Sequence, residues 1–249
     1  MKRSVILVKK EPEPEESKPC PFVNTHDKFN EAHYFISQMV HTYHEPEPFG
    51  WNFDAFLQAL RSVTFVMQKE LKDMGIKDDW YQAEQEWMKK DKILLAVVEG
   101  RNIVVHQGMI EQSSNAEMGM FRGRMLKLAA KMPVPPHIPS ATLLEMAKKT
   151  FGFVDEEHSA IDEQYGVRRQ WFCKIFGDEE IVSACDKAWS RIGKVFAKAH
   201  EQVGREFDGP PEHGHDTSKI SLLLESDVDP TLPQKWGWTS SEADDRRTS

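Results

Sequence analysis

Hydrophobic residues recur at intervals of three and four along several stretches of the chain, which is the period of an amphipathic helix. The clearest stretch covers residues 53–74 and is followed by Gly75, a residue typical of a helix C-terminus. The same pattern predicts helices over about residues 27–43, 80–90, 91–109 and 179–203, and a shorter one over 140–150. Helices therefore dominate the predicted fold.

The middle of the chain, about residues 108–178, lacks a sustained helical period. Its PVPPHIP segment (133–139) cannot be helical, because proline lacks a backbone N–H and clashes with the preceding turn. Residues 125–132 fit a helix or a strand, and residues 169–176 carry the aromatic and β-branched side chains of a strand. We therefore predict an irregular insertion that can contain β-structure.

Both ends of the chain are polar. Residues 1–24 include the run EPEPEESKPCP, whose low hydrophobicity and prolines favour disorder. The last residues are rich in Gly, Pro, Asp and Ser. The sequence thus predicts a disordered tail (1–24), one helical domain (25–205) that contains the insertion, and a polar C-terminal tail (206–249).

The composition, with 39% hydrophobic and 29% charged residues, is that of a globular protein. A net charge of −8 argues against a broad surface that coats nucleic acid, because such a surface needs many Lys and Arg contacts to phosphate. No apolar run approaches the roughly 20 residues that span a bilayer. No membrane association is predicted.

The three cysteines, Cys20, Cys173 and Cys185, show no metal-ligand spacing and follow no signal peptide. Reduced thiols in the cytoplasm are therefore expected. His213 and His215 lie in the Gly/Pro-rich tail with no further ligand nearby in the sequence. Neither a metal ion nor a cofactor is predicted.

An arginine interrupts the apolar stripe of the helix predicted over residues 91–109. The stripe consists of Leu94, Val97, Val98, Val104, Val105 and Met109. Arg101 lies near its centre, and Asn102 and His106, four residues apart, share a neighbouring face. A buried unpaired charge costs several kcal/mol, so Arg101 needs either a carboxylate or a water-filled pocket. Gly100 marks a bend or a close approach by another backbone.

The spacing of Arg101, Asn102 and His106 resembles the Arg-x4-to-6-His motif of the HEPN superfamily. The stretches NFDAFLQALRSVTFVMQKEL (52–71) and RNIVVHQG (101–108) are also similar to a group of small bacterial HEPN-like proteins. The resemblance covers about residues 26–110 and, more weakly, 180–203. It implies a mainly α fold: a HEPN-like four-helix bundle core with a partly irregular C-terminal extension that can contain β-structure.

The resemblance implies a metal-independent endoribonuclease that acts on RNA. His106 would be the general acid or base, because an unperturbed histidine has a pKa of about 6.5. Arg101 would bind the scissile phosphate, and Asn102 would orient the phosphate or His106. A setting in toxin–antitoxin systems or phage defence is also implied, with an antitoxin protein as partner.

A homodimer belongs to this hypothesis. Arg101 and His106 lie about 140° apart on one ideal helix, too far to share one phosphate easily. HEPN-like ribonucleases combine the motifs of two protomers in one cleft. Phe65, Ile103 and Ile110 point away from the inner stripes of their helices and indicate a second packed surface.

Arg61, Thr64 and Gln68 follow each other at spacings of three and four, so they can form one polar, substrate-binding edge of the same groove. The alternative is a solvated boundary face. For Arg101 the alternative is a structural ion pair with a carboxylate of a neighbouring helix. For the whole protein the alternative is a non-catalytic HEPN-like module for dimerising interaction or nucleotide binding.

Overall fold

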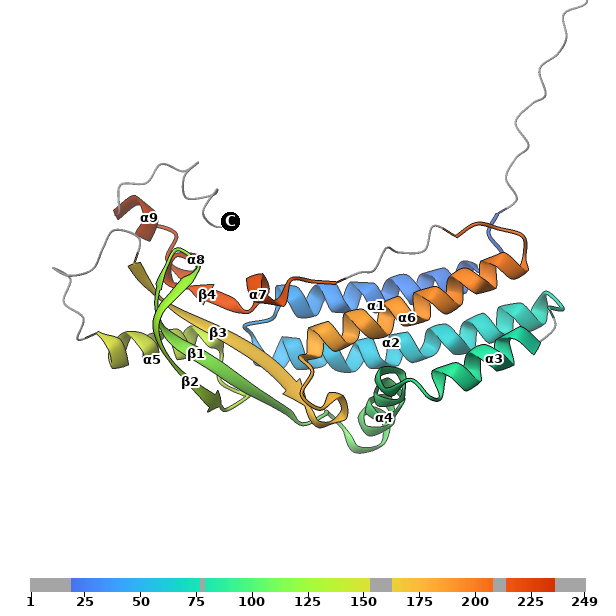
Figure 1. Cartoon of the computed structure of the whole chain (residues 1–249), viewed down its shortest axis with the longest axis horizontal. Helices are drawn as coiled ribbons and strands as arrows, with labels where there is room; N and C mark the ends of the chain where they lie inside the picture. The colour runs from blue at the N-terminus through green and yellow to red at the C-terminus, as the bar shows by residue number, and fades with distance from the viewer. Residues whose placement is uncertain (1–18, 77–78, 153–162, 208–213, 236–249) are drawn as a thin grey trace, which may run out of the picture.

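The computed structural model describes residues 19–76, 79–152, 163–207 and 214–235. Long helices form one half of the molecule and a β-sheet the other (Figure 1). The helices are α1 (Val23–His41), α2 (Pro46–Asp73), α3 (Asp79–Met88), α4 (Lys92–Gln107), α5 (Ser140–Phe151), α6 (Ile181–Gln202), α7 (Thr217–Ile220), α8 (Glu225–Val228) and α9 (Leu232–Lys235). The strands are β1 (Gln112–Arg122), β2 (Met125–Val134), β3 (Glu163–Cys173) and β4 (Leu222–Leu224), and a 3₁₀ turn, η2 (Lys174–Phe176), follows β3.

Helices α1, α2 and α6 lie side by side and bury an aromatic-rich core (Figure 1). Trp189 of α6 stacks on Phe29 of α1 at a centroid distance of 4.4 Å, and its indole N–H donates to the carbonyl of Phe29. Such paired rings add packing energy to a large buried area. Each helix that the hydrophobic period predicted is present in the structure.

The described residues do not form a four-helix bundle, so the prediction of a mainly α, bundle-type fold is corrected to mixed α/β. Three helices are long, with 19, 28 and 22 residues, whereas α4 has 16 and runs across their direction (Figure 1). A helix that crosses its neighbours shares only a short contact with them.

A four-stranded antiparallel sheet, in the order β2-β1-β3-β4, replaces the expected irregular insertion. Strands β1 and β3 pair over their whole length, from Gln112 opposite Cys173 to Arg122 opposite Glu163. Helix α5 covers one face through a small apolar cluster. The members of this cluster are Ala116, Met118, Val134, Leu143, Leu144, Ala147 and Val167. Residues 125–134 are a strand, which settles the ambiguity between helix and strand.

Parts of both predicted tails belong to the folded body. Phe22 is fully buried, and the backbone N–H groups of Asn24 and Thr25 donate to the carboxylate of Glu70 on α2. At the other end, β4 adds to the sheet through pairing with residues 166–168 of β3. Residues 1–18 and 236–249 of the predicted tails lie outside the described residues.

Gly100 lets α4 lie close to its neighbours. A Cβ at this position would lie 2.7 Å from Ile175 Cδ1 and about as close to side-chain methyls of Leu57 and Ile110. The expected close approach by another backbone is corrected: side chains of neighbouring segments make the close contact at Gly100. Within the described residues, no helix combines the length and the apolar character that crossing a bilayer requires.

Candidate functional site

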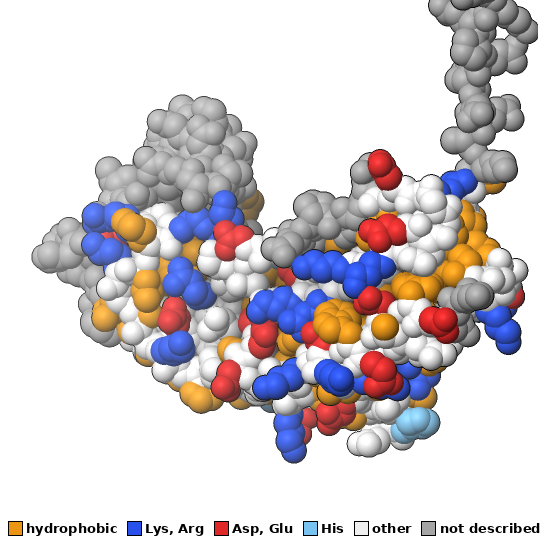
Figure 2. Space-filling view, turned by 45° about the vertical axis from the view of Figure 1, so that its right-hand side comes forward, with side chains coloured by type: hydrophobic (Ala, Val, Ile, Leu, Met, Phe, Trp, Pro, Cys, Tyr) orange, Lys and Arg blue, Asp and Glu red, His pale blue; other side chains and the backbone are white. Residues whose placement is uncertain are grey.

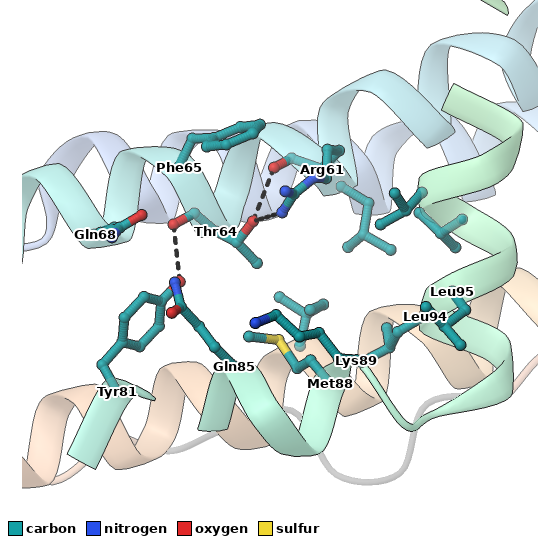
Figure 3. A pocket seen from close by; sticks show the side chains of 14 residues that line it. Arg61, Thr64, Phe65, Gln68, Tyr81, Gln85, Met88, Lys89, Leu94 and Leu95 are labelled. Carbon is teal, nitrogen blue, oxygen red and sulfur yellow. Dashed lines mark hydrogen bonds between the residues drawn. The ribbon is translucent and has the colours of Figure 1, made fainter. Parts of the chain in front are cut away.

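Helices α2, α3 and α4 enclose a cavity of about 320 Å³ (Figure 3). Most of its wall is apolar and consists of Leu60, Met88, Leu94, Leu95, Val97, Val98 and Ile192. Arg61, Thr64 and Gln68 line it from α2, and Gln85 of α3 and Lys89, the residue after α3, line it from the other side. The three α2 residues that the sequence placed on one polar edge thus reach the same cavity, because spacings of three and four keep them on one helical face.

The guanidinium of Arg61 is the main charge at this cavity. Its Nη1 donates to Thr64 Oγ1 at 2.6 Å, and the group lies 4.1 Å from the centroid of the Phe65 ring. Burial lowers its pKa, and the charge of Arg101 lowers it further. Among the described residues, no carboxylate forms an ion pair with Arg61. The guanidinium of Arg61 is half-buried, and its positive charge is not neutralised by any described carboxylate.

Tyr81 closes the cavity from α3. Its hydroxyl donates to the backbone carbonyl of Thr64 at 3.0 Å, and burial raises its pKa to about 12. The phenol is therefore neutral at physiological pH, and it does not supply an anion to Arg61. This hydrogen bond instead fixes α3 against α2 and so sets the width of the cavity (Figure 3).

Arg101 lies half-buried on α4, and its Nη1 is 3.4 Å from Asn102 Oδ1. In the part of the chain that the structure describes, it has no ion pair with a carboxylate, so the predicted structural pair is not formed. Arg101 does not line the cavity, but it is close enough to Arg61 to affect its pKa. Two uncompensated cations therefore lie near each other on α2 and α4.

A second, shallow hollow adjoins the cavity. Asn102 and His106 line it, and Leu95 and Val98 line both the hollow and the cavity. His106 is exposed near the end of α4, and Arg101 is not among the residues that line the hollow. The structure thus brings Asn102 and His106 together, but it does not bring Arg101 and His106 into one pocket of a single chain.

Of the three residues expected to point outward, only Phe65 does so, with 54% of its surface exposed. Ile110 is buried and Ile103 packs partly against the core. The reason is that the chain turns at Gly108, where φ is +107°, and folds Ile110 back against α4 at Gly100.

The visible molecular surface carries side chains of both charges. On the face shown in Figure 2, Lys and Arg side chains are interspersed with Asp, Glu and hydrophobic ones, and no continuous basic surface covers the described part of it. A local cationic site is therefore a better candidate for phosphate binding than a broad basic face.

One group of side chains has the donor types and spacing of a metal site, and the sequence analysis missed it. Cys20, His26 and His200 place one ligand atom each within 4.8 Å of one another. A cysteine six residues before a histidine is a weak signal, and His200 lies 174 residues further along.

The two histidines of the C-terminal tail do not form a described metal site. His215 forms a hydrogen bond with Asp186, and His213 lies outside the described residues.

The fold and the cavity define a mixed α/β protein with a ligand-sized site between helices. Residues 13–222 match the family model for bacteriophage lambda protein ea47, so the chain belongs to this family. It is 24% identical over 170 residues to Protein ea47 of Escherichia phage lambda, an alignment that covers 66% of this chain and 40% of that protein. The chain thus aligns with less than half the length of this relative. No solved structure matches it significantly.

This family assignment corrects the HEPN assignment, which was wrong. The ea47 match extends through the helices and the sheet, whereas the HEPN resemblance used one short motif and two helical stretches. An arginine and a histidine five residues apart occur on many amphipathic helices, so the motif alone does not identify a family.

Proposed function

We propose that this protein binds a small phosphate-bearing ligand, of which a nucleotide is the class that fits best, in the cavity between α2, α3 and α4. The observation that carries the proposal is Arg61, a half-buried guanidinium on the cavity wall with no carboxylate partner among the described residues. Arg101 adds a second uncompensated charge nearby. A guanidinium binds phosphate oxygens through paired N–H groups, and the anion would neutralise the charge of Arg61.

The cavity itself favours a ligand with a flat apolar part. Its volume of about 320 Å³ is at the lower end of the range of about 300–1,000 Å³ that is usual for small-molecule sites. Leu60 and Leu94 supply apolar contact area for a ring, and the amides of Gln68 and Gln85 can pair with polar edges of a base. A nucleotide combines such a ring with the anion that Arg61 requires.

Arg61→Met is expected to weaken nucleotide binding by about 10- to 100-fold, because a hydrogen bond to a charged group contributes roughly 1.5–3 kcal/mol. The binding of a panel of nucleoside monophosphates, diphosphates and triphosphates would be measured by calorimetry, with the corresponding nucleosides for comparison. Stability should change little, since Arg61 has no ion pair to lose.

Lys69→Met is the matched control, because it removes one positive charge from the exposed side of the same helix. It should bind the panel as the wild type does. The proposal is wrong if no nucleotide binds the wild type, or if Arg61→Met binds as tightly as the wild type.

A second candidate, cleavage of RNA without a metal, is favoured by the hollow that adjoins the cavity. A phosphodiester that extends from the cavity would pass Leu95 and Val98 and reach Asn102 and His106. His106 would then serve as general acid or base. Because Arg101 does not line this hollow, an Arg101 from a second protomer would have to stabilise the phosphate, which requires a homodimer.

His106→Ala is expected to slow the cleavage of single-stranded RNA by at least about 100-fold, the usual contribution of one general acid or base. Its melting temperature should not change, because the side chain is exposed. His41→Ala removes an exposed histidine from α1 and serves as the control. Equal cleavage by wild type and His106→Ala, or a rate that requires added Mg²⁺, would rule out this candidate while leaving nucleotide binding open.

A further inference from the structure

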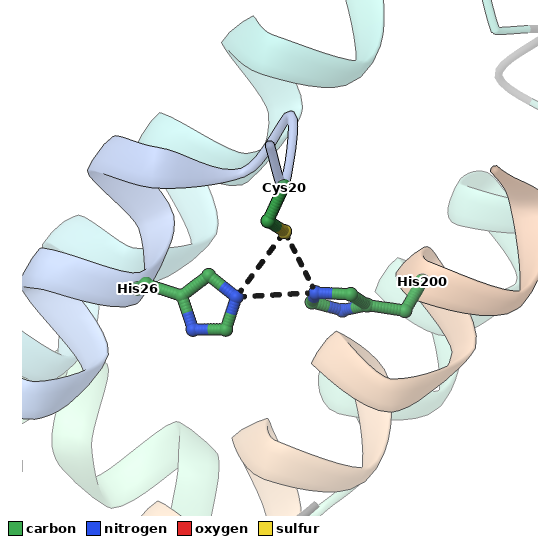
Figure 4. Close-up of side chains that lie close together, drawn as sticks. All are labelled: Cys20, His26 and His200. Carbon is green, nitrogen blue, oxygen red and sulfur yellow. Dashed lines mark hydrogen bonds between the residues drawn. The ribbon is translucent and has the colours of Figure 1, made fainter. Parts of the chain in front are cut away.

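Two side chains from the start of the described chain, Cys20 and His26, meet the distant His200 where α1 begins and α6 ends (Figure 4). Cys20 Sγ lies 3.4 Å from His26 Nε2 and 3.3 Å from His200 Nε2, and the two Nε2 atoms are 3.2 Å apart. These atoms form a nearly equilateral triangle, with each side chain pointing to its centre (Figure 4). All three side chains are potential metal ligands, since they offer a thiolate and two imidazole nitrogens.

Hydrogen bonds alone cannot account for all three contacts. His200 Nδ1 donates to the carbonyl of Phe196 at 3.0 Å, so a neutral His200 carries no proton on Nε2. Cys20 and His26 can each direct one proton into the triangle. At most two of the three contacts can therefore be hydrogen bonds, and the third has no proton of its own to share.

The triangle has the dimensions of one face of a tetrahedral zinc site. With Zn–N distances of about 2.0–2.1 Å and a Zn–S distance of about 2.3 Å, tetrahedral coordination separates two nitrogens by about 3.3 Å and a sulfur from a nitrogen by about 3.6 Å. The observed separations, 3.2 Å between the nitrogens and 3.3–3.4 Å from the sulfur, come within a few tenths of an ångström of these values.

We propose that Cys20, His26 and His200 bind one Zn²⁺ ion, with a water molecule at the fourth position. The ion would lie between the three ligand atoms, so no contact would need a proton. It would join Cys20 and His26, near the start of α1, to His200 in the last turn of α6. Thiolate and imidazole are the donors that zinc prefers. None of the three residues lines the cavity or the hollow on α4, so this site is separate from the proposed nucleotide site.

The surroundings are those of an ordered metal site. The ring of Phe207 stacks on His200 at 4.5 Å, and Phe22 and Phe196 contact the imidazoles from other sides. Burial lowers the pKa of both histidines, which favours the neutral form that binds metal. The hydrogen bond from His200 Nδ1 to Phe196 orients the ring, as outer contacts of metal-bound histidines do.

The test uses the full chain, purified without a histidine tag. Elemental analysis should find one zinc per chain, and removal of zinc followed by addition of Co²⁺ should give visible absorption bands together with a thiolate-to-cobalt charge-transfer band. Zinc at about a hundredfold excess over its dissociation constant should raise the melting temperature of the zinc-free protein by roughly 5–10 °C.

Cys20→Ser and His200→Asn should each lose stoichiometric zinc, and Cys20→Ser should lose the charge-transfer band. His26→Asn, whose side chain is partly exposed, provides a variant with less effect on the core. Near-ultraviolet circular dichroism reports whether each variant is folded. His41→Asn is the control and should bind zinc as the wild type does.

The proposal is overturned if the wild type binds neither Zn²⁺ nor Co²⁺ at stoichiometric amounts, or if folded His26→Asn and Cys20→Ser bind both as the wild type does. Stoichiometric copper or iron in place of zinc would overturn the assignment of the metal. If the wild type binds no metal and the three ligand variants are nevertheless less stable than the wild type, the side chains form a hydrogen-bonded cluster and not a metal site.

Discussion

Replacement of Arg169 by alanine is expected to lower the free energy of unfolding by about 3–5 kcal/mol, through a buried cavity and the loss of several hydrogen bonds to a charged group. Arg169 on β3 is fully buried. Its guanidinium donates to Ser114 Oγ and to the carbonyls of Pro136 and Ile138, and it lies 3.8 Å from the centroid of the Trp171 ring.

These contacts hold the proline-rich segment before α5 against the sheet. Proline cannot supply backbone N–H groups to a ladder, so this segment has few other ways to attach. Without Arg169, the partly buried carbonyls of residues 136 and 138 lose their hydrogen-bond donor. Urea denaturation of the variant and the wild type would measure the change.

Arg168→Ala is the matched control, because it is the neighbouring residue on β3 and points to the opposite face of the sheet. Arg168 is partly exposed and pairs with Glu117. Such surface pairs contribute about 1 kcal/mol or less. An equal loss of stability in the two variants would contradict the role assigned to Arg169.

Glu180→Gln is expected to stabilise the protein relative to the wild type as the pH rises, by up to about 3 kcal/mol. Glu180 precedes α6 and is nearly buried; it accepts hydrogen bonds from Tyr43 and from the backbone N–H of Ser183. Burial raises its pKa from 4.5 to about 7.

The direction follows from the two pKa values. Below a pH of about 4.5, Glu180 is protonated in the folded and the unfolded states, and no stability is lost. Between about 4.5 and 7 only the folded state keeps the proton, so stability falls as the pH rises through this window. Above about 7 the folded protein contains a buried carboxylate, and the loss is complete.

The measurement is the difference in unfolding free energy between Glu180→Gln and wild type at about pH 5 and at about pH 8, which removes the effects of other titrating groups. Glu179→Gln, which removes the neighbouring carboxylate that pairs with Lys187, is the control for the loss of one acidic group at this position. A difference that is the same at both pH values would show that Glu180 is ionised in the folded state at low pH.

The helices could be predicted from the sequence because the signal that specifies them is local. Residues 53–74 place their apolar side chains on one face through spacings of three and four, and the structure shows the helix α2 over Pro46–Asp73. For the same reason the sequence placed Arg61, Thr64 and Gln68 on one edge, and all three line the cavity. The opposite wall of that cavity comes from α3 and α4, whose approach to α2 no local pattern specifies.

The pairing of the sheet was not predicted, because it joins residues far apart in sequence. Only residues 169–176 carried the side chains of a strand, and residues 169–173 lie in β3. Strand β2 exposes most of its positions, including Met125 and Leu128, so it lacks the alternation that marks a half-buried strand. Strand β4 has only three residues and becomes a strand through β3, more than fifty residues earlier. The sequence therefore indicated that this insertion can contain β-structure, but it did not indicate which segments pair, because each strand is ordered by a distant partner.

The buried charge shows the same division between local and tertiary information. The sequence pattern drew attention to Arg101, which interrupts an apolar helical face and was expected to need an anion or water. It did not single out Arg169, the arginine that is fully buried among the described residues, because three carbonyls and a hydroxyl from distant segments converge on it. The meeting of Cys20, His26 and His200 likewise depends on how α1 packs on α6. Local periodicity determined the helices and their faces, and only tertiary packing decided which charged and metal-binding side chains share a site, since that depends on contacts between residues far apart in the chain.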